Sequence, residues 1–396
     1  METGVREGGV RTVERGALAK TAVYYTTFVV LGFATAVIGP TLPSLAEQTR
    51  TSLREVSFLF TALFAGYCAG SLSGGSVYDR AAGHPVMGLA LAAMLCMLLL
   101  VPLVPVLWVL TAVLLVLGFT EGLLDVGGNI LLVWVHGERV GPFMNGLHFA
   151  FGLGAFISPL VAAQVMRATG GIRWSYWVLC VLAAPLAVSL FRIPSPRSKT
   201  VHRSGTGRKD PLLVALISLL FFMHIGGEIG FGGWLFTYAS RMGLARETAA
   251  ALLTSAFWGS LTLGRLLGVP VVALVKPRVI LLASFTGAAA GFALMLAAPG
   301  SLAALWTGTV LVGLSIASMV PICFTFAGSC IDMSGRVASW FMVGGSVGTM
   351  LIPWLIGQLF EARGPRVTIH VLFVDFAAAL LLFLFTLRYA SKKACR

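Results

Sequence analysis

Long apolar runs separated by short polar stretches repeat along the whole chain. A helix needs about 20 mostly apolar residues to cross the hydrocarbon core of a bilayer. Twelve such runs can be placed, at about 21–45, 55–78, 85–104, 106–135, 142–166, 174–192, 211–238, 248–272, 279–298, 302–330, 336–360 and 367–388. Because no long polar segment is left over, the pattern predicts an all-α membrane protein with twelve transmembrane helices and no large soluble domain.

The longest polar interruption lies between the sixth and seventh runs. Residues 194–210 are rich in Arg, Lys, Ser, Pro and Gly, and they divide the chain into residues 1–193 and 211–396 with six runs each. This division is typical of transporters built from two six-helix bundles, with the substrate site near the bilayer midplane between them. We therefore expect two bundles joined by a cytoplasmic linker, although hydropathy alone also allows other twelve-helix folds.

The composition agrees with a membrane protein and explains its charge. Hydrophobic residues make up 58% of the chain and charged residues only 11%, against about 25% charged residues in a soluble domain. With both termini in the cytoplasm, most of the 28 Lys and Arg residues fall on the cytoplasmic side, as the positive-inside rule requires. We expect a multi-pass cell-membrane protein with no cleaved signal peptide, and the net charge of +13 does not require a nucleic-acid partner.

Asp125 lies within the apolar run 106–135, with Glu121 one helical turn before it and Asn129 one turn after it. An acid at the bilayer centre costs about 2.5–3.5 kcal/mol on a translocon scale, so such residues usually face a partner or a pathway. Residues four apart lie on the same helix face, so the three form a polar stripe. We predict that Asp125 binds a coupling cation and that Glu121 and Asn129 contact substrate.

The sequence is compatible with either of two coupling ions. Asp125 would bind a proton in dry surroundings and release it when water enters. Sodium would instead need an ionised carboxylate surrounded by further oxygens, which Asn129, Asn145 and the carbonyls near Gly127 and Gly128 would supply. Both a proton and a sodium ion at Asp125 and Asn129 are therefore compatible with the sequence, and no other cofactor is expected.

Further polar candidates lie in the fifth and seventh runs. Glu228 is the only acid of the seventh run, and the glycines around it permit a close approach by a ligand, so we predict a second cation-coupling residue. Asn145 and His148 are three apart and form a short polar face, which suits either sugar hydroxyls or an interhelical clamp. Trp234 offers a flat surface to a sugar ring.

One short segment resembles a known family. Residues 75–84, with the sequence GSVYDRAAGH, follow the second run and resemble the loop signature of the major facilitator superfamily, with one extra residue before the second glycine. The resemblance implies the major facilitator fold and gating or structural roles for Asp79 and Arg80. Arg265, near the inner end of the eighth run, is expected to act in the same way. Asp375, in the last run, is left outside the site.

Three further segments resemble one branch of that superfamily, the fucose and glucose permeases and sodium-dependent glucose transporter-like proteins. They are residues 124–129 (LDVGGN), 145–152 (NGLHFAFG) and 226–234 (GGEIGFGGW). The resemblance implies sugar uptake coupled to a cation. Fucose permeases carry an aspartate near the end of the first helix, where Gly39 stands here, so their pair of acids cannot simply be transferred.

These features predict a secondary active transporter that carries a sugar with a proton or sodium by alternating access, acting as a monomer in the bilayer. The alternative is a proton-coupled exporter of an amphipathic small molecule. Outside the transporters, a membrane receptor or an intramembrane enzyme would also bind a small molecule. The chain has neither a phosphate-binding loop nor a metal-ligand motif, so we do not expect an enzyme.

Overall fold

The computed structural model describes residues 3–196, 210–333 and 335–394, and its regular elements in these ranges are helices. The first half contains α1 (Thr3–Thr49), α2 (Leu53–Val56), α3 (Phe58–Arg80), α4 (Gly83–Leu100), η1 (Val101–Leu103), α5 (Leu107–His136), η2 (Gly137–Arg139), α6 (Val140–Thr169) and α7 (Arg173–Arg192). The second half contains α8 (Pro211–Arg241), α9 (Glu247–Leu274), α10 (Pro277–Ala297), α11 (Leu302–Ile316), α12 (Met319–Cys330), α13 (Gly335–Arg363) and α14 (Val367–Ala394).

The helices follow the predicted apolar runs. By length and composition, 11 helical stretches of the described chain are able to cross a membrane, and one of them, Leu107–Thr169, is 63 residues long. That stretch contains two predicted crossings, because α5 ends and the chain turns at Gly137, whose φ of 57° favours glycine. All twelve predicted runs are therefore helical, and the protein is an all-α, multi-pass membrane protein.

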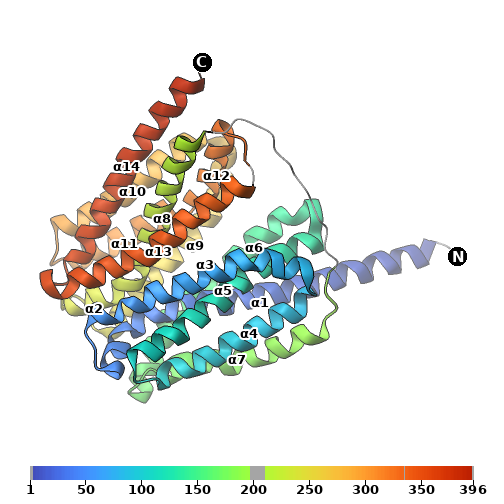
Figure 1. The fold of residues 1–396 in the computed structure, drawn as a ribbon, viewed down its shortest axis with the longest axis horizontal. Helices are drawn as coiled ribbons and strands as arrows, with labels where there is room; N and C mark the ends of the chain where they lie inside the picture. The colour runs from blue at the N-terminus through green and yellow to red at the C-terminus, as the bar shows by residue number, and fades with distance from the viewer. Residues whose placement is uncertain (1–2, 197–209, 334, 395–396) are drawn as a thin grey trace.

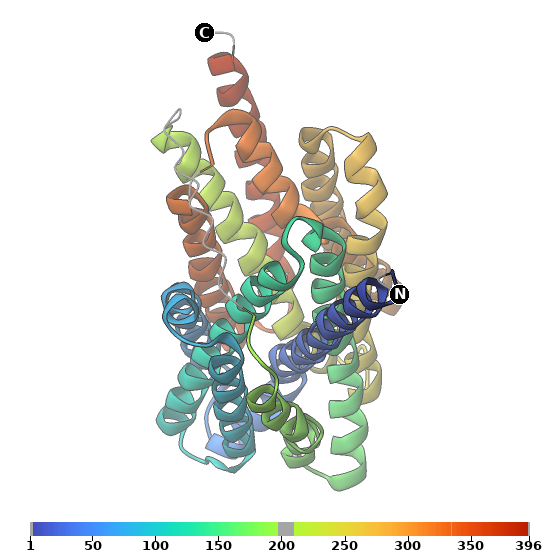
Figure 2. The same cartoon turned by 90° about the vertical axis from the view of Figure 1, so that its right-hand side faces the viewer.

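The helices form two groups. Helices α1–α7 pack mainly against one another, and so do most of α8–α14, but α9 packs more extensively on α6 of the first group than on any helix of its own. The two groups lie close together near α2 and diverge toward the side that carries the N- and C-terminal ends (Figure 1). Figure 2 views the molecule from that diverging side, with the N-terminal helix pointing toward the reader. Most of the predicted linker, residues 197–209, lies outside the described residues.

Glycines allow very close packing inside each bundle. A Cβ added at Gly66 of α3 would collide with the Leu115 carbonyl of α5, and one at Gly348 of α13 would collide with the Phe222 carbonyl of α8. Gly154 of α6 meets the Val29 carbonyl of α1 in the same way. Small residues let helix backbones approach each other in a membrane, so each bundle is held together by contacts that leave little room for water.

Hydrogen bonds between the two halves gather at the end opposite the termini. The Leu53 backbone N–H donates to Glu361 Oε1 of α13 at 2.8 Å, and Arg54 Nε donates to Gln358 Oε1 at 2.9 Å. Deeper in the molecule, a Cβ at Gly39 of α1 would lie 2.9 Å from the Gly232 carbonyl oxygen of α8. The halves are therefore closed against each other at this end and diverge at the other.

The tenth predicted run, 302–330, is not one continuous helix. It is broken at Ala317–Ser318, between α11 and α12. A break frees backbone carbonyls from their intrahelical partners, and inside a membrane such groups need another donor. Arg265 of α9 supplies one, because its Nε donates to the Ala317 carbonyl at 3.3 Å.

Candidate functional site

Asp125 lies at the contact between α5 and α3. The Tyr67 hydroxyl of α3 donates to Asp125 Oδ2 at 2.7 Å. The Asn129 side-chain amide donates to the Asp125 backbone carbonyl at 2.8 Å and to Oδ1 at 3.3 Å. Gly122 makes this arrangement possible, since any side chain there would collide with Tyr67 and Ser71 of α3. The structure thus brings the predicted pair Asp125 and Asn129 together and adds Tyr67, which lies 58 residues away in the sequence.

Glu121 differs from the other two members of the predicted stripe. Asp125 and Asn129 are half-buried, whereas Glu121 is only 1% exposed, and its Oε1 has no hydrogen-bond partner in the described part of the chain. The expectation that Glu121 contacts substrate is therefore not met in this conformation, because α3 covers the side chain. The stripe divides into one covered acid and one acid that solvent reaches.

Glu228 in the second bundle has two basic neighbours. Its Oε1 lies 3.6 Å from Arg265 Nη2, and its Oε2 lies 3.8 Å from His224 Nε2. Arg265 also bonds to Ala317 at the break between α11 and α12, so it links α8, α9 and the broken helix. The predicted gating residue is thus the counterion of the predicted cation-coupling residue, and the charge of Glu228 is balanced within its own bundle.

Asn145 and His148 of α6 are both exposed, and neither makes a hydrogen bond to any described residue. The packing of α6 on α9 places Gly152 against Thr262. One turn before Gly152 in α6, His148 lies near enough to Arg265 for their charges to interact. The ring of His148 also meets Phe28 of α1 edge-on, at 6.2 Å between centroids. This pair of polar side chains is not an interhelical clamp here, so its hydrogen-bonding groups are available to a ligand.

Trp234 is fully buried in the contact between the halves. Its exposure is 0%, and its indole N–H already donates to the Pro353 carbonyl at 2.9 Å. Its ring packs between Phe60 of the first half and Phe360 of the second. The predicted sugar contact is therefore inaccessible in this conformation, and Trp234 instead stabilises the closed end.

Asp79 and Arg80 are the last residues of α3 rather than part of a loop, since the helix continues to Arg80. Both are exposed, and within the described ranges neither takes part in an ion pair. Arg265 lies in the interior with Glu228, so the three predicted gating residues are not brought together. Asp375 of α14 is buried beside Gly227 of α8.

His84 is an anchor that the sequence analysis did not identify. Its Nδ1 bonds to the Ile193 carbonyl at 2.9 Å and its Nε2 to the Tyr24 hydroxyl at 2.7 Å, while its backbone N–H donates to Ser195 Oγ at 2.9 Å. Because a carbonyl only accepts, Nδ1 carries the proton and Nε2 accepts from Tyr24. His84 thus ties the start of the linker to α1 and α4, and its place in the family signature was the only signal for it.

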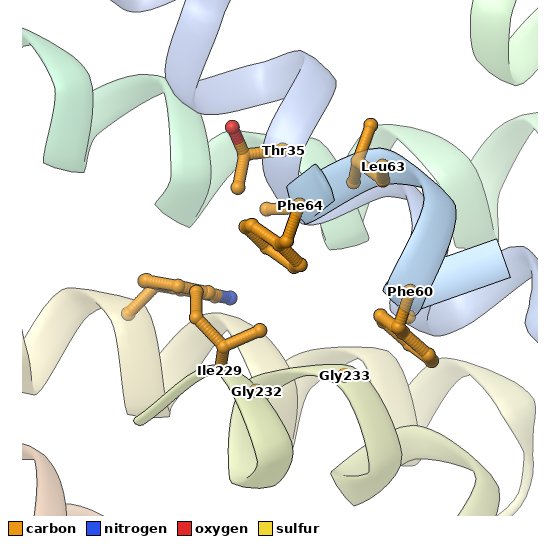
Figure 3. Close-up of a pocket in the computed structure, with 10 residues that line it drawn as sticks. Thr35, Phe60, Leu63, Phe64, Ile229, Gly232 and Gly233 are labelled. Atoms are coloured by element: carbon orange, nitrogen blue, oxygen red, sulfur yellow. The ribbon is translucent and has the colours of Figure 1, made fainter. Parts of the chain in front are cut away.

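A small cavity lies between the halves, where α1, α3, α8 and α9 meet (Figure 3). Its volume of about 10 Å³ leaves room for roughly one water molecule. Phe64 and Ile229 point toward one another across it (Figure 3), and the buried indole N–H of Trp258, another lining residue, has no partner within the described chain. Gly39 also lines this cavity, and the backbone of α8 leaves no room there for the aspartate that fucose permeases carry.

Comparison with known proteins gives a consistent result. Residues 24–353 match the profile of the Major Facilitator Superfamily. The chain is 30% identical over 373 residues to sodium-dependent glucose transporter 1 of Danio rerio, covering 84% of this chain and 63% of that protein. It is also 30% identical over 357 residues to the Xenopus laevis protein of the same name, covering 82% and 73%.

The fold is shared with a solved transporter. The structure superposes on the partially occluded, inward-open xylose transporter XylE of E. coli with a TM-score of 0.76 and 13% identity, covering 92% of this chain and 98% of that one. At this identity the likeness shows a common fold. Together with the profile match over most of the chain, it identifies the chain as a member of the Major Facilitator Superfamily, a family of multi-pass membrane transporters.

Proposed function

We propose that the chain is a secondary active transporter that moves a sugar together with a cation, and that Asp125 is the residue that couples the two. The observation that carries this proposal is the setting of Asp125. It is a half-buried carboxylate inside a membrane-spanning helix, oriented by Tyr67 and Asn129, on a bundle that separates from its partner at one end only. Intramembrane acids in such settings mark ion pathways.

The sugar is the substrate class that the relatives favour. Their names describe glucose transport, and the structural neighbour is named for xylose. Asn145 and His148 supply unpartnered donors and acceptors on the exposed face of α6, and Arg265 lies across from His148 on the other half. A sugar that bridges α6 and α9 would therefore contact both bundles and would bind them differently when they move, which is the requirement for coupling.

During alternating access, the contacts between the two halves at the closed end would break. The Leu53–Glu361 and Arg54–Gln358 hydrogen bonds and the Gly39–Gly232 approach would have to separate while the opposite ends come together. With the termini in the cytoplasm, as the distribution of basic residues predicts, the structure is an inward-open state. Rocking of one bundle against the other around a central site is the usual motion in this class of transporter.

Uptake into proteoliposomes tests the proposal. We expect the wild-type protein to accumulate a hexose or pentose when a sodium or a pH gradient is imposed, and Asp125→Asn to abolish the accumulation. Glu138→Gln is the matched control, because Glu138 is an exposed acid just beyond α5, and it should accumulate sugar like the wild type. Undiminished gradient-driven accumulation by Asp125→Asn would refute the role of Asp125.

A further inference from the structure

Glu121 lies on the face of α5 that packs tightly against α3, and its side chain is covered there. Gly118, Glu121, Gly122 and Asp125 lie on the same side of the helix, because residues three and four apart are neighbours. Side chains at the two glycines would collide with the backbone of α3, so water is excluded. The Ser71 hydroxyl of α3, which faces Gly122, is also buried and lies close to Tyr67. Glu121 Oε1 is therefore an unpartnered carboxyl oxygen in a dry contact within the described chain.

No positive charge balances this acid pair. In the described residues, neither Glu121 nor Asp125 forms an ion pair, whereas Glu228 has Arg265. The helices packed on α5 contribute other titratable groups around this region, namely Tyr67 and Tyr78 of α3, Tyr24 of α1, His84 of α4 and His148 of α6. An ionised Glu121, which is 1% exposed and has no donor at Oε1 within the described chain, would be an unpaired charge in a dry contact.

The hydrogen bonds distinguish the two acids. Asp125 accepts from the Tyr67 hydroxyl at one oxygen and from the Asn129 amide at the other, and donors of this kind stabilise an ionised carboxylate. Glu121 Oε1 receives no such bond. The Tyr67 hydroxyl donates to Asp125, and Tyr67 is also near enough to Glu121 for the two to interact electrostatically.

We propose that Glu121 and Asp125 together form a proton-binding site that holds one proton, and that in this conformation the proton resides on Glu121. Asp125 is the member that solvent reaches, and Glu121 is the covered member that retains the proton while the halves diverge. This inference rests on the proposed transport function and names a proton as its coupling ion. Glu228, whose charge Arg265 balances, does not release the coupled proton.

Infrared spectroscopy in H₂O and D₂O tests the protonation of Glu121 without any substrate. A protonated carboxyl group has a carbonyl stretch that shifts on deuteration. The variants are compared in a protein that also carries Asp375→Asn, because Asp375 Oδ2 is likewise buried without a hydrogen-bond partner in the described chain and would add a band of its own. In that protein we expect the band, its loss on adding Glu121→Gln, and its retention at a shifted position on adding Glu121→Asp, which guards against a folding defect in the first variant. Asp125→Asn should keep the band. A band that persists with Glu121→Gln would overturn the proposal.

Proton movement into the liposomes during sugar uptake, followed with a pH-sensitive dye, tests the coupling. A pH difference of one unit drives at most about a tenfold accumulation when one proton is carried per sugar. We expect accumulation by the wild type under a pH gradient without sodium, and its loss in Glu121→Gln. Accumulation driven by sodium alone, with no proton movement, would contradict the choice of ion. If the wild-type protein accumulated no sugar at all, the proposed function would fail, whereas the infrared band would still report on Glu121.

Discussion

Gly39→Ala is the substitution that best separates an effect on the movement of the two halves from an effect on the stability of the fold. The added methyl carbon would lie 2.9 Å from the Gly232 carbonyl oxygen and 3.2 Å from the Gly233 carbonyl oxygen, well inside the 3.5–4.0 Å at which such atoms attract. Both atoms belong to the backbone of α8 and cannot rotate away. Overpacking of this kind costs about 1–3 kcal/mol.

The clash in Gly39→Ala raises the free energy only of the conformation in which the two halves meet at the closed end. Gly39 and Gly232 belong to different halves, so separating the closed end relieves the clash. A penalty of about 1–3 kcal/mol would therefore shift the equilibrium away from this state by roughly 5- to 150-fold. Gly154→Ala provides the contrast, because its methyl group would collide with the Val29 carbonyl inside the first bundle in every conformation. We expect that variant to lose thermal stability without changing the distance between the halves.

The measurement is a distance between spin labels at residues 47 and 363, exposed positions on opposite halves at the closed end, in a protein without its native cysteines. We expect one short distance for the wild type and a larger share of a longer distance for Gly39→Ala. Gly75→Ala, where a Cβ meets nothing within 4 Å, should match the wild type. An unchanged distance distribution in Gly39→Ala, or a fall in melting temperature without a new distance, would refute the reasoning.

Two other predictions follow from the site. Arg265→Met leaves Glu228 without its counterion, and because the Arg265 side chain is 31% exposed the loss should lie below the 3–5 kcal/mol typical of fully buried pairs, at about 1–3 kcal/mol. The double variant Glu228→Gln/Arg265→Met should recover most of this stability in thermal unfolding, and a double variant no more stable than the single one would contradict the pairing. Trp234→Phe removes the hydrogen bond to Pro353 and should cost about 1 kcal/mol with no change in sugar affinity. A severalfold weaker affinity would instead make Trp234 a ligand contact.

The closed end also explains why Gly39 departs from the family pattern. An acid at this position would face Gly232 and Gly233 at backbone distance, in a cavity with room for roughly one water. Without an acid at position 39, a second carboxyl group to act with Asp125 would have to come from another position. Glu121 is one turn away from Asp125 on the same helix. In our proposal the pair of acids therefore lies within α5 rather than across two helices.

The positions of the helices could be predicted from the sequence alone, but the ion pair between Glu228 and Arg265 could not. Asp125 was recognisable because the cost of an acid in an apolar run depends only on its local surroundings. Trp234 and Glu121 were assigned to the substrate from residue type and spacing, yet both are buried. The break at Ala317 was also missed, although the sequence signals it: Ser318 lies at the break, and Pro321 has no N–H to donate to the Ala317 carbonyl four residues earlier.

Local composition determined which segments span the membrane, because bilayer thickness sets the length of each apolar run and every helix satisfies its own backbone. It also determined that Asp125, Asn129 and Glu121 share one helix face. Only the tertiary structure decided their partners, since the rotation and approach of two helices depend on side chains far apart in the chain. The glycines of α3 and α5 bring Tyr67 to Asp125 and cover Glu121, and the packing of α9 on α8 brings Arg265 to Glu228.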